Sequence, residues 1–423
     1  MRIVELATND TLGGAARSAY RLHEGLRARG VDARMLARWK HSNDRSVAAL
    51  HAAFISADYA TQERATRQRW VRDNRTEHTD TLFSLGQPSI DIAMHPLLRS
   101  ADLVHLHWIA NFLGPSSFAS LARIRQPIVW TLHDEWGYTG GCHYTAGCEQ
   151  FRTQCMTCPQ LREDPLGLVQ SLFQQRCAAW AGANLTVVTP SRWLAQRAKS
   201  SAVLGAHRIE VIPYGLDHTV FAPASDDAIA AFRRRIGIAA DEVVFAFGVD
   251  RLGERRKGAD HLRDALAIVR AAGVDPVVLR FGDATGSDAP SARTIDLGPI
   301  QDDRALALVY HSTDAFILPT LEDNLPNGVL ESMASGTAVI AYATGGVPDL
   351  IDDGVHGWLA PTGDVRALAA VMRQAAGAKS ALRAAGAAGR ARIMERHTLA
   401  HQAECYIALY KDVYHRASRE AVA

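Results

Sequence analysis

The chain has 423 residues, more than one hydrophobic core usually fills, so two domains are expected. Its 46 Lys and Arg residues nearly balance its 45 Asp and Glu residues, and the formal net charge of +1 argues against a nucleic-acid partner. No apolar run approaches the roughly 20 residues of a membrane span. The start, MRIVELATND, lacks the basic region and long apolar stretch of a signal peptide, so we expect a cytoplasmic protein.

The first half of the chain alternates short apolar runs with amphipathic segments. Arg2 to Ala7 indicates a buried strand, and a turn with Gly13 and Gly14 leads into an amphipathic helix. Further strands are expected at residues 33–37, 103–107, 128–132, 185–189 and 209–213, with a helix at 194–200. Short apolar runs bounded by polar turns are typical of parallel strands covered on both faces, so this half predicts a doubly wound α/β domain.

One segment of this half is locally basic. Residues 63–75 carry five arginines around Trp70 and Val71, namely Arg64, Arg67, Arg69, Arg72 and Arg75. Peripheral contact with a membrane is one interpretation. A solvated surface helix is the other, and we favour it because the apolar face is thin.

A second segment, residues 140–161, is rich in cysteine. Cys142, Cys148, Cys155 and Cys158 follow the spacing C-x5-C-x6-C-x2-C, and the last pair has the spacing of half a zinc knuckle. Four thiolates can close a tetrahedral structural zinc site, which would fasten a long loop with few apolar residues. Reduced or disulfide-linked cysteines are the alternative, since the first spacing is looser than in common zinc ribbons.

After the sequence VIPYGLD the strand pattern restarts, at residues 243–247, 277–281, 315–318 and 338–341. We therefore place the domain junction near Gly215, with domains at 1–215 and 216–397. The Ala/Arg-rich stretch 371–392 has the composition of a good helix former. A last segment, 398–423, is helical in period and carries Tyr406, Leu409, Tyr410 and Tyr414 for packing.

Two turns of the second half favour a nucleotide diphosphate. The first, GVDRLGERRKG, crowds Arg251, Arg255, Arg256 and Lys257 after an apolar strand, where cations suit phosphate oxygens. The second, LPTLEDNLPNGVLESMASGTAV, joins a strand to a helix that opens with unpaired N–H groups, and it adds Asp323 and Glu331. Taken alone, this second turn would be interpreted as a helix N-terminus that carries acidic residues. Together the turns predict one site, with cations for phosphate and Glu331 for a ribose diol.

Two histidines end predicted strands of the first domain, His107 in VHLHW and His133 in WTLHDEW. A single histidine is more often a hydrogen-bonded structural residue than a functional one. A position at the carboxyl end of a parallel strand makes both of them candidates for a site.

The order of these motifs resembles the retaining glycosyltransferases of family 4, which have the GT-B fold. Four elements carry the resemblance: the Gly13-Gly14 turn, VIPYGLDHTVF, the RKG element at 256–258, and EDNLPNGVLESMASG followed by TGGVPDLI. The resemblance implies two Rossmann-like domains facing across a cleft, the second holding the nucleotide-sugar donor and the first the acceptor. It also implies a final helix that crosses back to the first domain.

The resemblance assigns roles to residues of this chain. Glu331 resembles the acid that binds the ribose, and Lys257 the phosphate lysine. The family's phosphate arginine falls on Leu252, so Arg251 or Arg256 would take that role. The earlier acid of the family's E-x7-E pattern falls on Asp323 beside Glu322. The resemblance makes Asn324 and Leu325 main-chain donors, and it places Gly13 and Gly14 near the phosphate. It places His133 beside the reacting carbon, and His107 and Asp134 on the acceptor side.

The resemblance therefore predicts a retaining, metal-independent hexosyltransferase. It would move a sugar from a UDP- or GDP-linked donor to a saccharide acceptor, a lipid-linked intermediate of surface polysaccharide such as exopolysaccharide or lipopolysaccharide. The ends of the Cys-rich segment, TGGCHY and CPQL, resemble a subset of family 4 assigned to exopolysaccharide and colanic-acid-type assembly. The alternatives are a GT-B nucleotide-sugar 2-epimerase and a non-catalytic, zinc-stabilised binding protein on the same scaffold.

Overall fold

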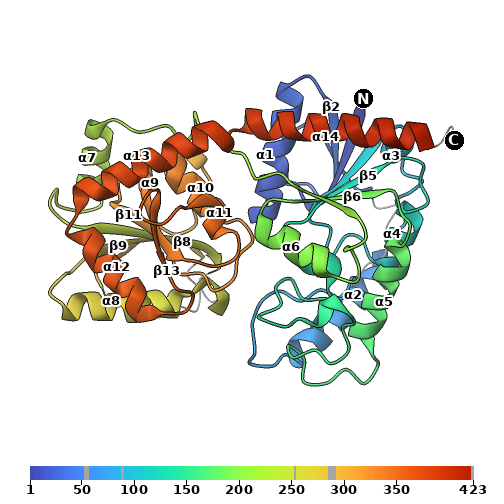
Figure 1. Cartoon of the computed structure of the whole chain (residues 1–423), viewed down its shortest axis with the longest axis horizontal. Coiled ribbons are helices and arrows are strands. Elements are labelled where there is room, and N and C mark those ends of the chain that lie inside the picture. Colours follow the sequence, from blue (N-terminus) through green and yellow to red (C-terminus); the bar gives the residue numbers. More distant parts are fainter. Residues whose placement is uncertain (52–56, 87–89, 252–253, 284–291, 421–423) are drawn as a thin grey trace. The chain divides into compact units, whose positions relative to one another are not determined.

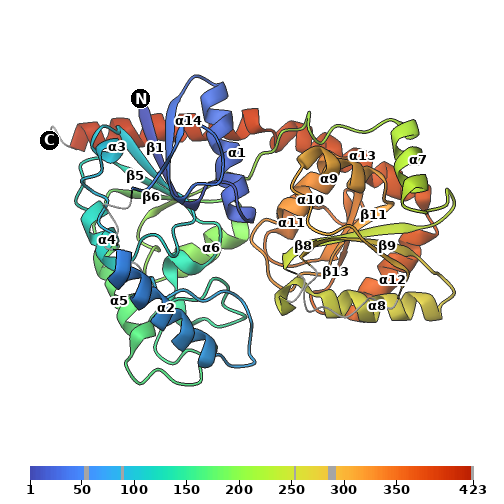
Figure 2. The ribbon, with the colours of Figure 1, turned by 180° about the vertical axis from the view of Figure 1, so that it is seen from behind.

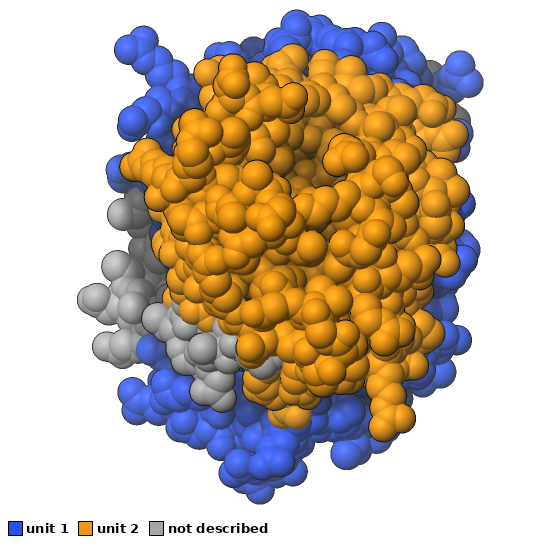
Figure 3. All heavy atoms as spheres, turned by 90° about the vertical axis from the view of Figure 1, so that its left-hand side faces the viewer, with its two compact units in different colours: residues 1–214, 400–423 blue, residues 215–399 orange. Residues whose placement is uncertain are grey.

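The computed structural model describes residues 1–423 apart from 52–56, 87–89, 252–253, 284–291 and 421–423. At residues 57–64, 249–251 and 420 only the backbone is described. The chain divides into two compact units: unit 1 is residues 1–214 with 400–423, and unit 2 is residues 215–399 (Figure 3). Each unit is built around one parallel β-sheet.

Unit 1 contains a seven-stranded sheet in the order β3-β2-β1-β4-β5-β6-β7, in which every neighbouring pair is parallel. Its strands are β1 (Arg2–Asn9), β2 (Asp32–Trp39), β3 (Val47–Ala49), β4 (Leu103–Leu106), β5 (Ile128–Thr131), β6 (Leu185–Thr189) and β7 (Arg208–Val211). Its helices are α1 (Gly14–Ala28), α2 (Ala57–Asp73), α3 (Pro96–Arg99), α4 (Pro115–Leu121), α5 (Leu168–Trp180), α6 (Arg192–Ser200) and α14 (Leu399–Glu420), with short 3₁₀ turns η2 (Trp136–Tyr138) and η3 (Gln150–Arg152).

The strand order of unit 1 reverses between β1 and β4. The chain proceeds from β1 outward to β2 and β3, then returns to the other side of β1 and continues from β4 to β7. In open α/β sheets ligands bind beyond the carboxyl ends of the strands at such a reversal. The loop that begins α1 and the residue after β4, His107, both follow these two strands.

The C-terminal helix α14 covers one face of the unit 1 sheet (Figure 1, and from behind in Figure 2). Tyr406, Leu409 and Tyr410 of α14 are buried against Ile3 of β1 and other apolar residues of the sheet and of α1, namely Leu22, Leu26, Ala33, Leu103, Val129, Val188 and Ile212. The packing expected of these three residues is confirmed. The expectation for Tyr414 was wrong, because it is 37% exposed on the outer side of the helix.

Unit 2 contains a six-stranded parallel sheet in the order β10-β9-β8-β11-β12-β13. Its strands are β8 (Val244–Arg251), β9 (Val277–Asp283), β10 (Thr294–Asp296), β11 (Ala315–Leu318), β12 (Ala338–Tyr342) and β13 (Gly357–Ala360). Its helices are α7 (Asp226–Arg235), α8 (Ala259–Ala271), α9 (Asp303–His311), α10 (Asn327–Ala334), α11 (Val347–Leu350), α12 (Val365–Ala376) and α13 (Lys379–Arg396), with the 3₁₀ turn η4 (Arg255–Lys257). Here the reversal lies between β8 and β11.

The expected doubly wound α/β fold is confirmed in each unit. Sequence patterns missed three strands, β3, β10 and β13, which are edge strands of three or four residues and therefore too short for a clear apolar run. The stretch 371–392, expected to be helical, is two helices rather than one, because the chain breaks at Gly377 and Ala378 between α12 and α13.

Residues 63–73 of the basic segment lie on α2, and Arg75 follows the end of that helix. The side chain of Arg64 falls outside the described part of the structure, while Arg69 and Arg72 are exposed. Among the described residues, no helix combines the length and the apolar character that crossing a membrane requires.

Candidate functional site

In unit 2 the two motif loops leave neighbouring strands at the reversal of the sheet. The loop after β8 contains η4 and leads into α8, and the loop after β11 leads into α10. Since β8 and β11 are parallel neighbours, the two loops emerge at the same edge of the sheet. The topology thus places the basic and the acidic motif at the position where α/β proteins bind ligands.

The two loops are in direct contact. The Arg256 carbonyl accepts hydrogen bonds from the Leu321 amide at 2.8 Å and the Thr320 hydroxyl at 3.1 Å. Gly258, at φ +73°, lies so close to Pro319 that a Cβ atom there would sit 2.0 Å from its carbonyl oxygen. Glycine is therefore required in the RKG element, both for the left-handed backbone and for the close approach.

The TGG element joins the same site. The Asp323 carbonyl oxygen accepts a hydrogen bond from the Gly346 amide at 3.1 Å. A Cβ atom on Gly345, which has φ +53°, would lie 1.7 Å from that oxygen. Three motifs that are separated in the sequence therefore form one packed turn.

The acid and the cations of this turn are paired. Lys257 Nζ lies 2.8 Å from Asp323 Oδ2, and Arg256 Nη1 lies 3.3 Å from the same oxygen. Burial alone would raise the pKa of Asp323, but the charges of Lys257 and Arg256 hold it below its usual range. A buried carboxylate that is kept ionised by two cations holds both cations in place.

The remaining acids differ in position. Glu331 lies one turn into α10 and is 4% exposed, with its carboxylate 3.5 Å from the Tyr310 hydroxyl. Glu322 is half-buried, and its carbonyl accepts from Arg256 at 2.5 Å. Asn324 and Leu325 are buried between the two acids.

The two candidate phosphate arginines lie on η4 and at the end of β8. Arg256 is anchored in the turn by Glu254, Glu322 and Asp323. Arg251 ends β8, and its backbone pairs with Asp283. The Arg251 side chain and all of Leu252 lie outside the described residues.

In unit 1 the glycine turn begins the first helix. Gly13 is the N-cap of α1 at φ +95°, a conformation that residues with a side chain rarely adopt. A Cβ built at Gly13 would meet no atom within 4 Å. This turn follows β1, at the reversal of the unit 1 sheet.

His107 and His133 come together at the ends of neighbouring strands. His107 Nδ1 lies 3.2 Å from His133 Nε2, and His133 Nδ1 lies 2.7 Å from the Tyr214 hydroxyl. Both imidazoles are buried, and burial together with His107 lowers the pKa of His133 to about 3. His133 is therefore a neutral imidazole whose two nitrogens both contact groups of unit 1.

Asp134 holds the start of the Cys-rich loop. Its carboxylate accepts from Trp108 Nε1 at 2.6 Å and the Trp136 amide at 2.9 Å, and it lies 2.7 Å from His143 Nδ1. Burial would raise the pKa of Asp134, but His143 and these hydrogen bonds lower it. With these partners Asp134 orients the loop and Trp108.

The Cys-rich loop is fastened by polar side chains. Arg197 of α6 pairs with the buried Glu135, with Glu149 at 3.0 Å and with the Thr145 hydroxyl at 2.6 Å. Cys142 and Cys155 are buried in the main apolar cluster of unit 1. These contacts supply the fastening that the loop was expected to need.

The cysteines of this loop are free thiols. Burial raises the pKa of Cys155 to about 12. Among the described residues, one group of three metal-binding side chains has ligand atoms within 4.8 Å of one another, and it is Glu5, His105 and His107 rather than the cysteines. No three of the loop's described sulfurs therefore lie within 4.8 Å of one another, whereas the edge of a ZnS₄ tetrahedron is about 3.8 Å. The zinc site stays a prediction.

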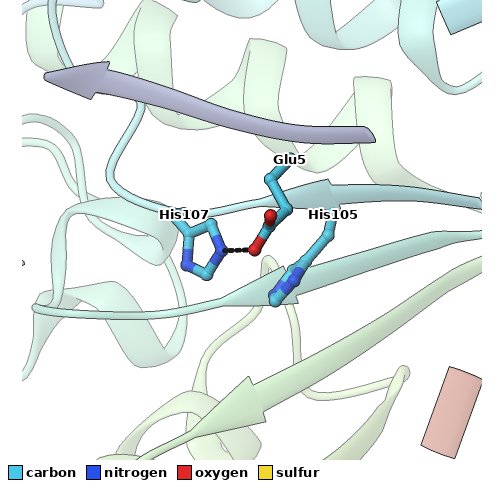
Figure 4. Close-up of side chains that lie close together, drawn as sticks. All are labelled: Glu5, His105 and His107. Carbon is cyan, nitrogen blue, oxygen red and sulfur yellow. Dashed lines mark ion pairs between the residues drawn. The ribbon is translucent and has the colours of Figure 1, made fainter. Parts of the chain in front are cut away.

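Four further buried residues contact one another or the two histidines, and sequence analysis did not predict them: Glu5, His23, His105 and Tyr214. Figure 4 shows Glu5 of β1 facing His107, with His105 beside it. Glu5 is fully buried. A charged residue inside the apolar run RIVELA was the available signal, because buried charges are paired or functional.

Comparisons with known proteins agree with this architecture. The chain matches the family Glycosyltransferase Family 4 over residues 12–220 and Glycosyl transferases group 1 over residues 242–377. A putative colanic acid biosynthesis glycosyl transferase, WcaC of Escherichia coli K12, is 25% identical over 256 residues, which cover 58% of this chain and 60% of that protein. The match thus spans less than two thirds of that relative's length.

Solved structures share the fold over nearly the whole chain. Sucrose-phosphate synthase from Thermosynechococcus elongatus has a TM-score of 0.69 at 20% identity, covering 98% of this chain and 100% of that one. Anabaena Alr3699/HepE, solved in complex with UDP, has a TM-score of 0.65 at 16% identity, covering 97% and 100%. With family matches in both halves and a doubly wound sheet in each unit, the chain belongs to the GT-B glycosyltransferases of family 4, the glycosyl transferases of group 1.

Proposed function

We propose that this protein is a retaining glycosyltransferase that takes a hexosyl group from a UDP- or GDP-linked donor without a catalytic metal. The acceptor in this proposal is a saccharide, a lipid-linked intermediate of surface polysaccharide assembly. The observation that carries the proposal is the packed turn of unit 2, where Arg256, Lys257, Asp323 and Glu331 lie at the reversal of the sheet.

Donor binding follows from the charges of this turn. The two cations that Asp323 holds would contact the diphosphate, and charge-assisted hydrogen bonds compensate the phosphate oxygens for lost water. The backbone N–H groups at the start of α10 add donors for the same anion. Glu331, one turn further, would accept hydrogen bonds from the two ribose hydroxyls.

The same groups stabilise the leaving group. As the bond between sugar and diphosphate breaks, negative charge grows on the diphosphate, and Arg256 and Lys257 stabilise it more strongly than the ground state. In front-face attack the leaving phosphate takes the proton of the acceptor hydroxyl, so no separate general base is needed. His133, neutral and buried, fits a hydrogen-bonding role near the sugar better than a proton-transfer role.

The acceptor class rests on similarity rather than on the site. The relative from Escherichia coli is named for colanic acid biosynthesis. The alternatives are a nucleotide-sugar 2-epimerase and a non-catalytic binding protein. The turn EDNLPNGVLE and the intact Lys257 also favour transfer over those alternatives.

A thermal-shift panel of UDP, GDP, ADP and dTDP, with and without magnesium, tests the proposal. One nucleotide should raise the unfolding temperature selectively without magnesium, because a ligand stabilises the state that binds it. Glu331→Ala should lose this response and also sugar transfer. Tyr310→Phe is the matched control: it removes the same contact with Glu331 but leaves the carboxylate, so its response should persist.

Two results would contradict the proposal. No response to any nucleotide would remove the donor site, and a response only with magnesium would remove metal-independent binding. Normal nucleotide binding by a folded Glu331→Ala protein would remove the ribose assignment alone.

A further inference from the structure

A continuous series of polar contacts crosses the buried part of unit 1. It runs from Ser46 to His23, Glu5, His107, His133 and Tyr214. These residues come from β1, α1, the position before β3, the segments after β4 and β5, and the end of the first segment of unit 1. All six are at most 8% exposed, so protons on these atoms are set by their neighbours rather than by water.

The direction of the contacts can be worked out from the Ser46 end. The Ser46 hydroxyl donates to Asp44 Oδ1 at 2.7 Å, because an ionised carboxylate can only accept. Ser46 Oγ therefore accepts from His23 Nε2 at 2.8 Å. His23 Nδ1 contacts Glu5 Oε2, which also only accepts, so His23 carries both protons.

Charge balance then determines His107. Burial would raise the pKa of Glu5, but His23 and the hydrogen bonds of both histidines lower it to about 2. One buried carboxylate is thus matched by one imidazolium, His23, and a second buried cation at His107 would be uncompensated. His107 is the neutral member of the pair.

The position of the single His107 proton follows from Glu5 Oε1. This oxygen and His107 Nε2 lie 3.4 Å apart, and neither makes a hydrogen bond to any of the described residues. A proton on Nε2 gives both atoms a partner, whereas a bare Nε2 would oppose two lone pairs. His107 Nδ1 is then an acceptor, so His133 must donate from Nε2.

The last step reaches the residue proposed to contact the sugar. With its one proton on Nε2, neutral His133 presents a bare Nδ1, to which the Tyr214 hydroxyl donates at 2.7 Å. A sugar hydroxyl that replaced Tyr214 at this nitrogen would have to donate as well. His133 could not give a proton to the reaction.

We propose that Glu5, acting through His107, is a positioning residue that fixes His133 in its Nε2–H tautomer and makes its Nδ1 a pure hydrogen-bond acceptor for a donor-sugar hydroxyl. The sugar contact rests on the proposed transferase function. The hydrogen-bond series itself does not, because all its members lie in unit 1.

A metal ion is the competing explanation for the group of Glu5, His105 and His107. Both nitrogens of His105 are already used, since Nε2 lies 2.8 Å from the Thr131 hydroxyl and Nδ1 lies 2.7 Å from the Tyr410 hydroxyl. The Glu5 charge is also already matched by His23. The hydrogen-bond series accounts for these atoms without a cation.

Nitrogen-15 NMR of the histidine side chains in the full, ligand-free chain tests the proposal, because nitrogen shifts show which ring nitrogen is protonated. His133 signals are assigned by their loss in His133→Gln. In the wild type His133 should be protonated at Nε2 alone and His23 at both nitrogens. A His133 protonated at Nδ1, or at both nitrogens, would overturn the proposal.

Two matched variants test whether His107 sets the tautomer of His133. In His107→Phe the His133 Nε2 loses its contact with His107 Nδ1, so the proton should move to Nδ1 and donate to Tyr214. His105→Phe removes an equally buried imidazole from the same segment and should leave His133 unchanged. An unaltered tautomer in a folded His107→Phe protein, or the same change in both variants, would overturn the role of His107.

If His107→Phe does not fold, Glu5→Gln provides a second test of the hydrogen-bond series. The amide N–H would face His23 Nδ1 while the amide oxygen still accepts from His107. His23 should therefore lose one proton and His133 should keep its tautomer; a doubly protonated His23 at neutral pH would contradict the series. Since no substrate is used, failure here is distinct from failure of the nucleotide panel.

Discussion

At the scale of single residues, the charge of Glu5 shows how a function-related residue can be placed inside a core. A carboxylate within a buried strand costs several kcal/mol unless its charge is matched and its oxygens are hydrogen-bonded. His23 pairs with one Glu5 oxygen and His107 faces the other at 3.4 Å, and in the proposed arrangement these contacts orient the proton of His133. The stability of the core therefore depends on the charge of Glu5, and the polarity of the proposed site depends on the acceptor oxygen that the same residue turns toward His107.

The stability of Glu5→Gln tests this at equilibrium. At neutral pH the variant should lose about 3 kcal/mol of unfolding free energy, the cost of breaking a buried ion pair. Asp32→Asn, which alters an exposed ion pair on the adjacent strand β2, should lose about 0.5 kcal/mol or less. Denaturant unfolding followed by tryptophan fluorescence measures both changes.

The pH dependence of this difference has a definite sign. The folded pKa of Glu5 lies at about 2, below its ordinary value of 4.5. A lowered carboxylate pKa stabilises the fold fully above the ordinary value and loses that effect as the pH falls toward the folded one. The gap between wild type and Glu5→Gln should narrow between pH 4.5 and 2; a constant gap would show that Glu5 is not ionised in the folded protein.

At the scale of elements, the strand-to-helix turns of unit 2 explain why the motifs have their composition. Gly258 and Gly345 are each pressed against a backbone carbonyl, of Pro319 and Asp323 respectively, where no Cβ atom fits. The cations of η4 are then held by Asp323 across the two loops. The glycines set the distance between the loops, and the charges provide the chemistry.

The Cys-rich loop carries the zinc prediction, which elemental analysis tests directly. Protein purified without chelator should contain about one zinc per chain if four thiolates close around the metal. The sulfurs would have to move closer than their present placement. A folded, metal-free protein whose Cys142, Cys148, Cys155 and Cys158 all react as free thiols after unfolding would contradict the prediction.

At the scale of the whole molecule, the two ends of the chain complete one unit. Helix α14 covers a sheet face that begins with Ile3, nearly 400 residues earlier in the sequence. Without α14 this apolar face of unit 1 would be exposed to water. The C-terminal residues are therefore part of the core of unit 1.

Two tyrosines of α14 give a matched test. Tyr406→Ala should destabilise unit 1 by about 3 to 5 kcal/mol, the usual cost of truncating a large buried side chain. Tyr414→Ala, on the exposed side of the same helix, should change stability by about 0.5 kcal/mol or less. Tryptophan fluorescence follows unit 1, since Trp358 is the one tryptophan of unit 2. Equal effects of both variants would contradict the packing of α14.

The sequence by itself determined the local structure and the composition of the motifs. Apolar runs indicated most strands, and the turns with Gly258, Lys257 and Glu331 indicated an anion site, because strand periodicity and turn chemistry depend on neighbouring residues. It did not show that Asp134 is engaged by the Cys-rich loop. It also did not show that Tyr414 is exposed.

Only the tertiary structure decided which buried groups meet. Glu5, His107 and His133 belong to three different segments, and they come together because the sheet order β1-β4-β5 places those strands side by side. No local pattern encodes that order, since it results from crossover connections of many residues. The protonation of His133 therefore depends on the strand order of the folded sheet, whereas the sequence supplies only the residue types that take part.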